Sequence, residues 1–140
     1  MADILNFHFD VDGENFSSAG EASVVVKKKL RQLGYSPEVI RKVSIAMYEG
    51  EINMVIHAHG GTADVNVTDR DIVIVLADKG PGIPDVALAM QEGYSTAREN
   101  IRALGFGAGM GLPNMKKYSD YMNIDTEIGA GTTITMKVNL

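Results

Sequence analysis

The sequence of 140 residues lacks cysteine, an excess of basic residues and any long hydrophobic run. A chain without cysteine can form neither a disulfide framework nor a thiolate metal site. Because the formal net charge is -5, no general positive field is present to attract nucleic acid. No stretch approaches the roughly 20 apolar residues of a membrane span, and the N-terminus lacks the basic-then-apolar pattern of a signal peptide. We therefore expect a cytoplasmic protein that binds neither nucleic acid nor membrane.

The rest of the composition is typical of a soluble globular domain, with 45% hydrophobic and 22% charged residues. A chain of this length suffices for one domain with its own hydrophobic core. No internal repeat, low-complexity tract or linker interrupts it. We expect residues 1–140 to form a single domain.

Alternation of apolar and polar side chains predicts the strands, because successive residues of a strand point to opposite faces of a sheet. The most apolar run, residues 72–77, indicates a buried strand. The last two strands flank Gly129-Ala130-Gly131 and are predicted to form a hairpin. The predicted strands cover residues 4–11, 62–68, 71–77, 122–126 and 134–140.

Apolar residues at helical spacing predict two long helices and two short ones. The first long helix begins with a capping-box pattern at Ser18 and Glu21 and ends at Gly34. The second covers residues 36–58, with Ser36 as its N-cap. The short helices are predicted at residues 85–91 and 112–118.

The motif Asp78-Lys79-Gly80-Pro81-Gly82-Ile83-Pro84 follows the most apolar strand directly. A carboxylate accepts hydrogen bonds and donates none, so Asp78 suits an amino group such as the exocyclic amine of adenine. The two glycines let the backbone turn sharply and let a ligand approach it. The alternative is an ordinary turn rich in Asp, Gly and Pro, which is the commoner meaning of such a segment by itself.

The second long helix carries a carboxylate and an amide inside an apolar face. At ~100° per residue, Asn53 lies roughly 40° from Glu49, and apolar residues flank both. An unpaired charge in such a position is costly, so these residues form either a functional pair or a buried structural network. Ser44, Tyr48 and Glu51 are predicted to share the opposite, solvent-exposed side, and Glu51 is expected to have no role in chemistry.

Four alternating glycines, Gly105, Gly107, Gly109 and Gly111, immediately precede the predicted helix at residues 112–118. They leave backbone N–H groups free to face an anion, and a helix that begins behind such a loop is suited to bind phosphate. The alternative is a flexible connector, which glycine-rich segments often form.

Two threonines begin the final strand, where a hydroxyl could face the same pocket as Asp78. Either Thr132 or Thr133 would supply that hydroxyl. The alternative, a pair of strand-favouring residues without a further role, applies to at least one of them.

The order of these motifs resembles that of the GHKL ATPases, the fold shared by gyrase B, Hsp90, histidine kinases and MutL. The branch most similar in pattern contains the small stand-alone serine-protein kinases and anti-sigma regulatory factors. The resemblance spans the whole chain and implies an α+β two-layer sandwich of the Bergerat type. A mixed, mostly antiparallel sheet of about five strands would be covered on one face by about three helices. The matching segments are residues 48–58 (N box), 77–83 (G1 box), 91–96 with 105–117 (lid and G2 box) and 129–133 (Gly-Thr turn).

The resemblance also implies a role for each matching residue. Glu49 would be the general base, Asn53 would ligate Mg²⁺, and Asp78 would accept from the adenine amino group. Residues 92–111 would form an ATP lid that orders when the phosphates bind. The residues implied in binding ATP are Asn53, Asp78, Gly80, Gly82, Ile83, Gly105, Gly107, Gly109, Met110, Gly111, Leu112, Thr132 and Thr133.

The function that the resemblance implies is an ATP-dependent serine/threonine-protein kinase or anti-sigma factor. Its partner would be a small regulatory protein with a phosphorylatable Ser or Thr, of the anti-sigma-factor antagonist type, or a sigma factor. Two alternatives stay open: an ATP-gated module that captures an output protein with little catalysis, and a plain ATPase. Monomer and homodimer are both open as well. A sensor histidine kinase is disfavoured because His57 lies within the nucleotide-binding helix.

Residues 97–104 depart from the family pattern, since the kinase-type relatives pass almost directly from the lid to the glycines. Arg98 and Arg102 in this stretch are candidates for contacting either the γ-phosphate or a protein partner. Solvation is the equal alternative for both.

Overall fold

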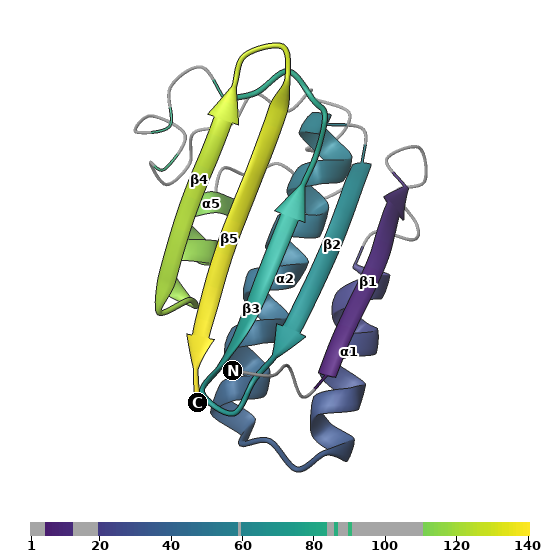
Figure 1. Ribbon diagram of the computed structural model, residues 1–140, viewed down its shortest axis with the longest axis vertical. Helices are drawn as coiled ribbons and strands as arrows, with labels where there is room; N and C mark the ends of the chain where they lie inside the picture. The colour runs from purple at the N-terminus through teal and green to yellow at the C-terminus, as the bar shows by residue number, and fades with distance from the viewer. Residues whose placement is uncertain (1–4, 13–19, 59, 84–85, 87–89, 91–110) are drawn as a thin grey trace.

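The computed structural model of the protein describes residues 5–12, 20–58, 60–83, 86, 90 and 111–140. Within them, five strands form one antiparallel sheet in the order β1-β2-β3-β5-β4, and three helices cover one face of it (Figure 1). The expected two-layer α+β fold is confirmed. The elements are β1 (Leu5–Asp12), α1 (Glu21–Gln32), α2 (Pro37–Ala58), β2 (Gly60–Val67), β3 (Asp71–Ala77), α5 (Gly111–Lys117), β4 (Tyr121–Glu127) and β5 (Gly131–Asn139).

The start of α1 differs from the prediction. The helix begins at Glu21, and its N-cap residue is Gly20, whose φ of 94° is left-handed and which has no side chain with which to cap. Ser18 lies outside the described residues. In contrast, Ser36 caps α2 as predicted, because its Oγ accepts a hydrogen bond from the N–H of Val39 at 3.3 Å.

The predicted short helix at residues 85–91 falls almost entirely outside the described residues. Only Val86 and Met90 are described, and the N–H of Met90 donates to the carbonyl of Val86 at 3.0 Å. This bond spans one helical turn. No helix among the described residues is long and apolar enough to cross a membrane.

The hydrophobic core lies between the sheet and the helices. Alternate residues of each strand face the helices, and those of β2, β3 and β5 are buried almost completely. The opposite face of the sheet carries polar side chains, such as His8, whose Nδ1 pairs with Asp64 Oδ1 at 2.6 Å. The largest fully buried side chains are Leu30, Met47, Ile72, Ile74, Leu76, Met115 and Met136.

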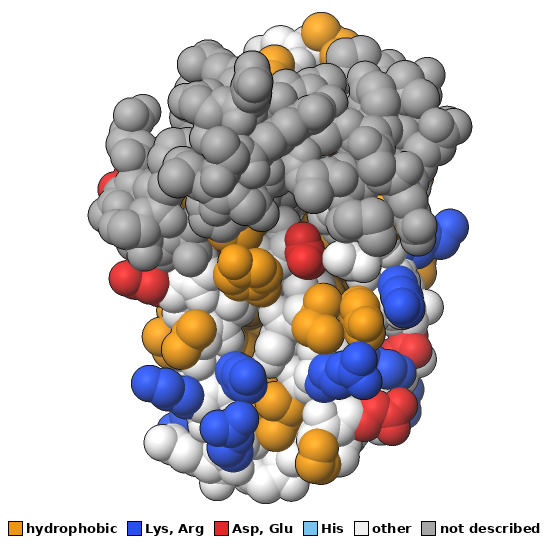
Figure 2. Space-filling model, turned by 180° about the vertical axis from the view of Figure 1, so that it is seen from behind, with side chains coloured by type: hydrophobic (Ala, Val, Ile, Leu, Met, Phe, Trp, Pro, Cys, Tyr) orange, Lys and Arg blue, Asp and Glu red, His pale blue; other side chains and the backbone are white. Residues whose placement is uncertain are grey.

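The helix side of the molecule is richer in positive charge than the net charge suggests. Figure 2 shows Lys and Arg side chains gathered across the lower part of this face, below a group of hydrophobic ones. The exposed basic residues of the three helices are Lys27, Lys28, Lys29, Arg31, Arg41, Lys116 and Lys117. The negative net charge is therefore distributed unevenly.

Gly50 lets α2 lie directly on β3. A Cβ atom built on this residue would overlap Leu76 Cδ1 and would come within 3.3 Å of Met115 Cε. Both neighbours are fully buried, so they have little room to move. The helix that carries Glu49 and Asn53 is thus held close to the sheet by the absence of a side chain between them.

Gly50→Ala should therefore destabilise the protein, although alanine within a helix is normally about 1 kcal/mol more favourable than glycine. We expect urea denaturation to show a net loss of roughly 1–3 kcal/mol, the usual cost of overpacking a core. In a Leu76→Ala background the same substitution should cost nothing, because the overlapping methyl group is gone. An equal cost in both backgrounds would contradict this account of Gly50.

Candidate functional site

Asp78 is held at the end of β3 by the strand beside it. Its Oδ1 accepts hydrogen bonds from the N–H groups of Gly80 at 2.9 Å and Thr132 at 3.1 Å, and its own N–H donates to the Thr132 carbonyl at 2.9 Å. A side chain on Gly131 would overlap the Asp78 carbonyl oxygen. Among the described residues, both donors to the carboxylate engage Oδ1. None of these residues donates to Oδ2, so we expect Oδ2 to be the oxygen that meets a ligand.

Gly80 and Gly82 are needed for contacts within the protein itself. A Cβ on Gly80 would lie 2.6 Å from Ala58 Cβ, at the end of α2. Gly82 has a φ of 84°, and a Cβ there would lie 2.6 Å from the Glu127 carbonyl oxygen. We expected the glycines to admit a ligand. That stays a prediction, and the structure shows that the glycines bring this loop against α2 and β4.

Thr132, and not Thr133, shares the face of Asp78. Thr132 is 6% exposed and lies on the helix-covered face of β5, whereas Thr133 lies on the opposite face. The Thr132 hydroxyl is hydrogen-bonded to Thr126 Oγ1 at 2.8 Å, and Thr126 Oγ1 also accepts from the N–H of Ile83 at 2.9 Å. This hydroxyl pair links the loop after β3 to the hairpin of β4 and β5.

Glu49 and Asn53 converge beside the first residue of α5. A Cβ atom on Gly111 would lie 3.9 Å from both Glu49 Oε2 and Asn53 Oδ1, which are its nearest neighbours among the described residues outside its immediate neighbourhood in the chain. Both side-chain oxygens therefore lie beside the same backbone position. The prediction that they share one side of the helix agrees with this geometry.

The environment of Glu49 alters its acidity. The carboxylate is half-buried, and Asn114 Nδ2 of α5 donates to its Oε1 across 3.4 Å. Burial raises the pKa of Glu49, and the hydrogen bond from Asn114 opposes the rise. A carboxylate with a raised pKa accepts a proton more readily than an ordinary one, which suits a general base.

The prediction that Glu51 faces solvent is wrong. Glu51 is 2% exposed, and its carboxylate accepts hydrogen bonds from backbone N–H groups at the start of α1. The side chain does point away from Glu49, but α1 covers that side of α2. Burial raises the pKa of Glu51, and the backbone hydrogen bonds oppose the rise.

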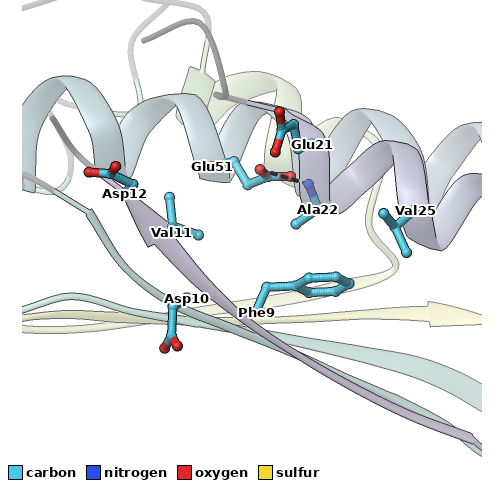
Figure 3. A pocket seen from close by; sticks show the side chains of 8 residues that line it. All are labelled: Phe9, Asp10, Val11, Asp12, Glu21, Ala22, Val25 and Glu51. Carbon is cyan, nitrogen blue, oxygen red and sulfur yellow. Dashed lines mark hydrogen bonds between the residues drawn. The ribbon is translucent and has the colours of Figure 1, made fainter. Parts of the chain in front are cut away.

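A separate pocket of about 250 Å³ opens beside Glu51, between β1 and α1 (Figure 3). None of Glu49, Asn53 and Asp78 lines it, so it does not belong to the candidate site. In Figure 3 the Asp10 side chain turns toward the other face of the sheet. The lining residues are Phe9, Asp10, Val11, Asp12, Glu21, Ala22, Val25 and Glu51.

Several predicted site residues are not placed by this geometry. The ATP lid at residues 92–111 lies outside the described residues except for Gly111. The side chain of Leu112 is buried in the core, so only its backbone is free to contact a nucleotide. The predicted residues that fall outside the described part of the chain are Gly105, Gly107, Gly109 and Met110.

Comparison with known sequences identifies relatives over most of the chain. Residues 38–140 match the family described as histidine kinase-, DNA gyrase B- and HSP90-like ATPases. The chain is 31% identical over 108 residues to the serine/threonine-protein kinase RsbT of Bacillus subtilis, an alignment that covers 74% of this chain and 75% of RsbT. It is 32% identical over 125 residues to the anti-sigma F factor of Clostridium novyi, covering 85% and 84% of the two chains.

Two solved structures share the fold. The SiaB-SiaC complex from Pseudomonas aeruginosa contains a chain that matches with a TM-score of 0.65 at 13% identity, over 97% of this chain and 89% of that one. The RsbU and RsbW domains of Rv1364c from Mycobacterium tuberculosis match with a TM-score of 0.65 at 16% identity. That match covers 96% of this chain and 32% of the solved one, so this chain spans about a third of that protein. Sequence, fold and geometry agree that this chain belongs to the histidine kinase-, DNA gyrase B- and HSP90-like ATPases.

Proposed function

We propose that this chain binds ATP with Mg²⁺ in the cytoplasm and transfers the γ-phosphate to a serine or threonine of a small regulatory protein. The observation that carries the proposal is the convergence of Glu49 and Asn53 beside Gly111. Membership of this chain in a family of ATPases supports ATP as the ligand. A relative named as a serine/threonine-protein kinase supports a protein hydroxyl as the acceptor.

The base end of ATP would be recognised by Asp78. Its Oδ2 would accept a hydrogen bond from the adenine amino group, while Oδ1 stays bonded to the backbone of Gly80 and Thr132. The Thr132 hydroxyl lies on the same face and is the better candidate of the two threonines. Gly80, Gly82 and Ile83 would shape the loop around the base.

The phosphate end would lie beside Gly111. Asn53 Oδ1 is a neutral oxygen donor of the kind that Mg²⁺ accepts, and the Glu49 carboxylate lies beside the same residue, Gly111. When bound, Mg²⁺ would neutralise phosphate charge, which is a large part of what phosphoryl transfer requires. Glu49 would orient the acceptor hydroxyl and take its proton. Backbone groups of Gly105, Gly107, Gly109, Met110 and Leu112 are proposed to contact the phosphates.

The second candidate function is ATP-gated capture of an output protein such as a sigma factor. Its support is the similarity to proteins named anti-sigma F factor. The two functions differ in the fate of the γ-phosphate. When the protein is incubated with radiolabelled ATP and the small proteins encoded by neighbouring genes, a Ser or Thr of one of these proteins should become labelled. Stable binding of a partner without any label would favour capture.

Asp78→Asn should nearly abolish ATP binding in a folded protein. The Asn Oδ1 would stay on the N–H groups of Gly80 and Thr132, which turns the amide NH₂ toward the adenine amine. Two donors would then face each other. Calorimetry should show a loss of affinity of at least about 100-fold, in line with the cost of unpaired buried polar groups. Asp125→Asn, at an exposed position of β4, is the matched control and should bind normally. Unchanged affinity in Asp78→Asn would refute the adenine assignment.

Glu49→Gln should retain ATP binding and lose phosphoryl transfer. The amide preserves the shape of the side chain but cannot accept a proton, so we expect turnover to fall by roughly 10²–10⁴-fold. Glu38→Gln is the control on the same helix, because the Glu38 side chain is 80% exposed. A comparable fall in both variants would argue against Glu49 as the base.

The pH profile of turnover should report the raised pKa of Glu49. Activity requires the deprotonated carboxylate, so the acid limb should lie above the ordinary value of 4.5. Asn114→Ala removes a donor that stabilises the carboxylate, and the limb should move to still higher pH. Asn123→Ala, at an exposed position of β4, should leave the profile in place. A limb that moves to lower pH in Asn114→Ala would contradict the assignment.

A further inference from the structure

Glu51 joins two helices by accepting hydrogen bonds from N–H groups at the start of α1, which have no acceptor within that helix. Its Oε2 accepts from the N–H groups of Gly20 at 3.1 Å and Ala22 at 3.3 Å, and its Oε1 accepts from that of Ser23 at 2.6 Å. Figure 3 shows the Glu51 side chain reaching from α2 to the first turn of α1. A carboxylate of α2 thus does what an N-cap side chain of α1 would ordinarily do.

The hydrogen bonds of this contact are stronger than those of a neutral helix cap. The acceptor is a buried carboxylate, charge-assisted hydrogen bonds are about twice as strong as neutral ones, and the helix dipole favours a negative charge at this end. Gly20 contributes no side chain that could replace it. Glu51 therefore helps to fix the position of α1 relative to α2.

Three successive residues of α2 contact three different elements. Glu49 receives a hydrogen bond from α5, Gly50 packs on Leu76 of β3, and Glu51 binds the start of α1. Contacts in three directions fix the rotation of this helical turn about its own axis. Asn53 follows one turn after Glu49, so the same rotation sets where both of their side chains point.

We propose that Glu51 is a positioning residue: by binding the start of α1 it holds Glu49 and Asn53 in place beside Gly111. The inference rests on the proposed function, since it assigns Glu51 to the support of that site. A carboxylate that only stabilised the fold would affect the free energy of unfolding and leave the ligand properties of the folded protein unchanged. The two roles are therefore separable by experiment.

The test compares Glu51→Gln with Val26→Ala. The first keeps the size of the side chain but places an NH₂ group against a backbone N–H. The second removes buried volume from α1, because Val26 is 0% exposed. It leaves the hydrogen bonds between Glu51 and α1 in place. For each folded protein, calorimetry measures ATP affinity with and without Mg²⁺, and urea denaturation measures stability.

Both variants should be less stable than the wild type, and only Glu51→Gln should lose the gain in ATP affinity that Mg²⁺ provides. We expect that gain to fall by on the order of ten-fold, as when the supports of a metal ligand are removed. A full gain in Glu51→Gln, or an equal loss in Val26→Ala, would overturn the inference. If the proposed function itself is wrong, the result is different, because the wild type would then not bind ATP.

A second measurement needs no substitution. Coupling is reciprocal, so Mg²⁺ and ATP should slow hydrogen exchange at the amides of Ala22 and Ser23 in the wild type. The amide of Val39, bonded to Ser36 at the other end of α2, is the internal control and should not change. If the exchange rates at Ala22 and Ser23 are the same with and without ATP and Mg²⁺, the inference is overturned, even if Glu51→Gln does not fold.

Discussion

A carboxylate inside a protein requires hydrogen-bond donors around it, and α2 meets this requirement in two different ways within three residues. Glu51 is almost fully buried and accepts three backbone N–H groups at the start of α1. Glu49 is half-buried, and among the described residues its donor is Asn114, at a distance that is long for a hydrogen bond. The buried carboxylate with three backbone donors is suited to structure, and the half-buried one is suited to chemistry. The proposed division of roles follows from this difference in solvation.

The same reasoning applies to Asp78, whose two oxygens have different surroundings. Oδ1 is occupied by the backbone of Gly80 and Thr132, which fixes the plane of the carboxylate. A single side chain can therefore stabilise the loop through one oxygen and present the other to a ligand. This arrangement also explains why an amide at this position would not be a neutral replacement, since the backbone donors determine which end of the amide faces outward.

Much of the fold could be predicted from the sequence, because it follows from periodicity. The strands, the two long helices and the final hairpin are recovered from alternation and helical spacing. The convergence of Glu49 and Asn53 also follows, since a spacing of four residues places both on one side of α2. The sequence could also have predicted that Thr132 faces the core and Thr133 does not. The residues of β5 that alternate with Thr132, at even numbers, are the ones that face the core.

The error about Glu51 shows where such reasoning stops. A helical wheel gives the direction of a side chain around its own axis and says nothing about which other element lies in that direction. The side opposite Glu49 would be solvent in an isolated helix, and here the start of α1 covers it. Asn114 and Thr126 were missed for a related reason, since each acquires its partner only through tertiary packing. Polar residues within an apolar helix face are recognisable from sequence, but their donors are not.

The two ends of the candidate site differ in how firmly they are built, and this bears on how the site would work. At the proposed base end, backbone groups and the close approaches at Gly80, Gly82 and Gly131 leave little freedom, so Asp78 is held in place before any ligand binds. At the proposed phosphate end, Glu49 and Asn53 lie beside Gly111, and Glu49 is linked to α5 by the long hydrogen bond from Asn114. Binding of the base would thus cost little reorganisation, and the phosphates would meet a carboxylate that is only half-buried. Under the proposed assignment the γ-phosphate would lie at this end, so discrimination between nucleotides with different numbers of phosphates would be made there.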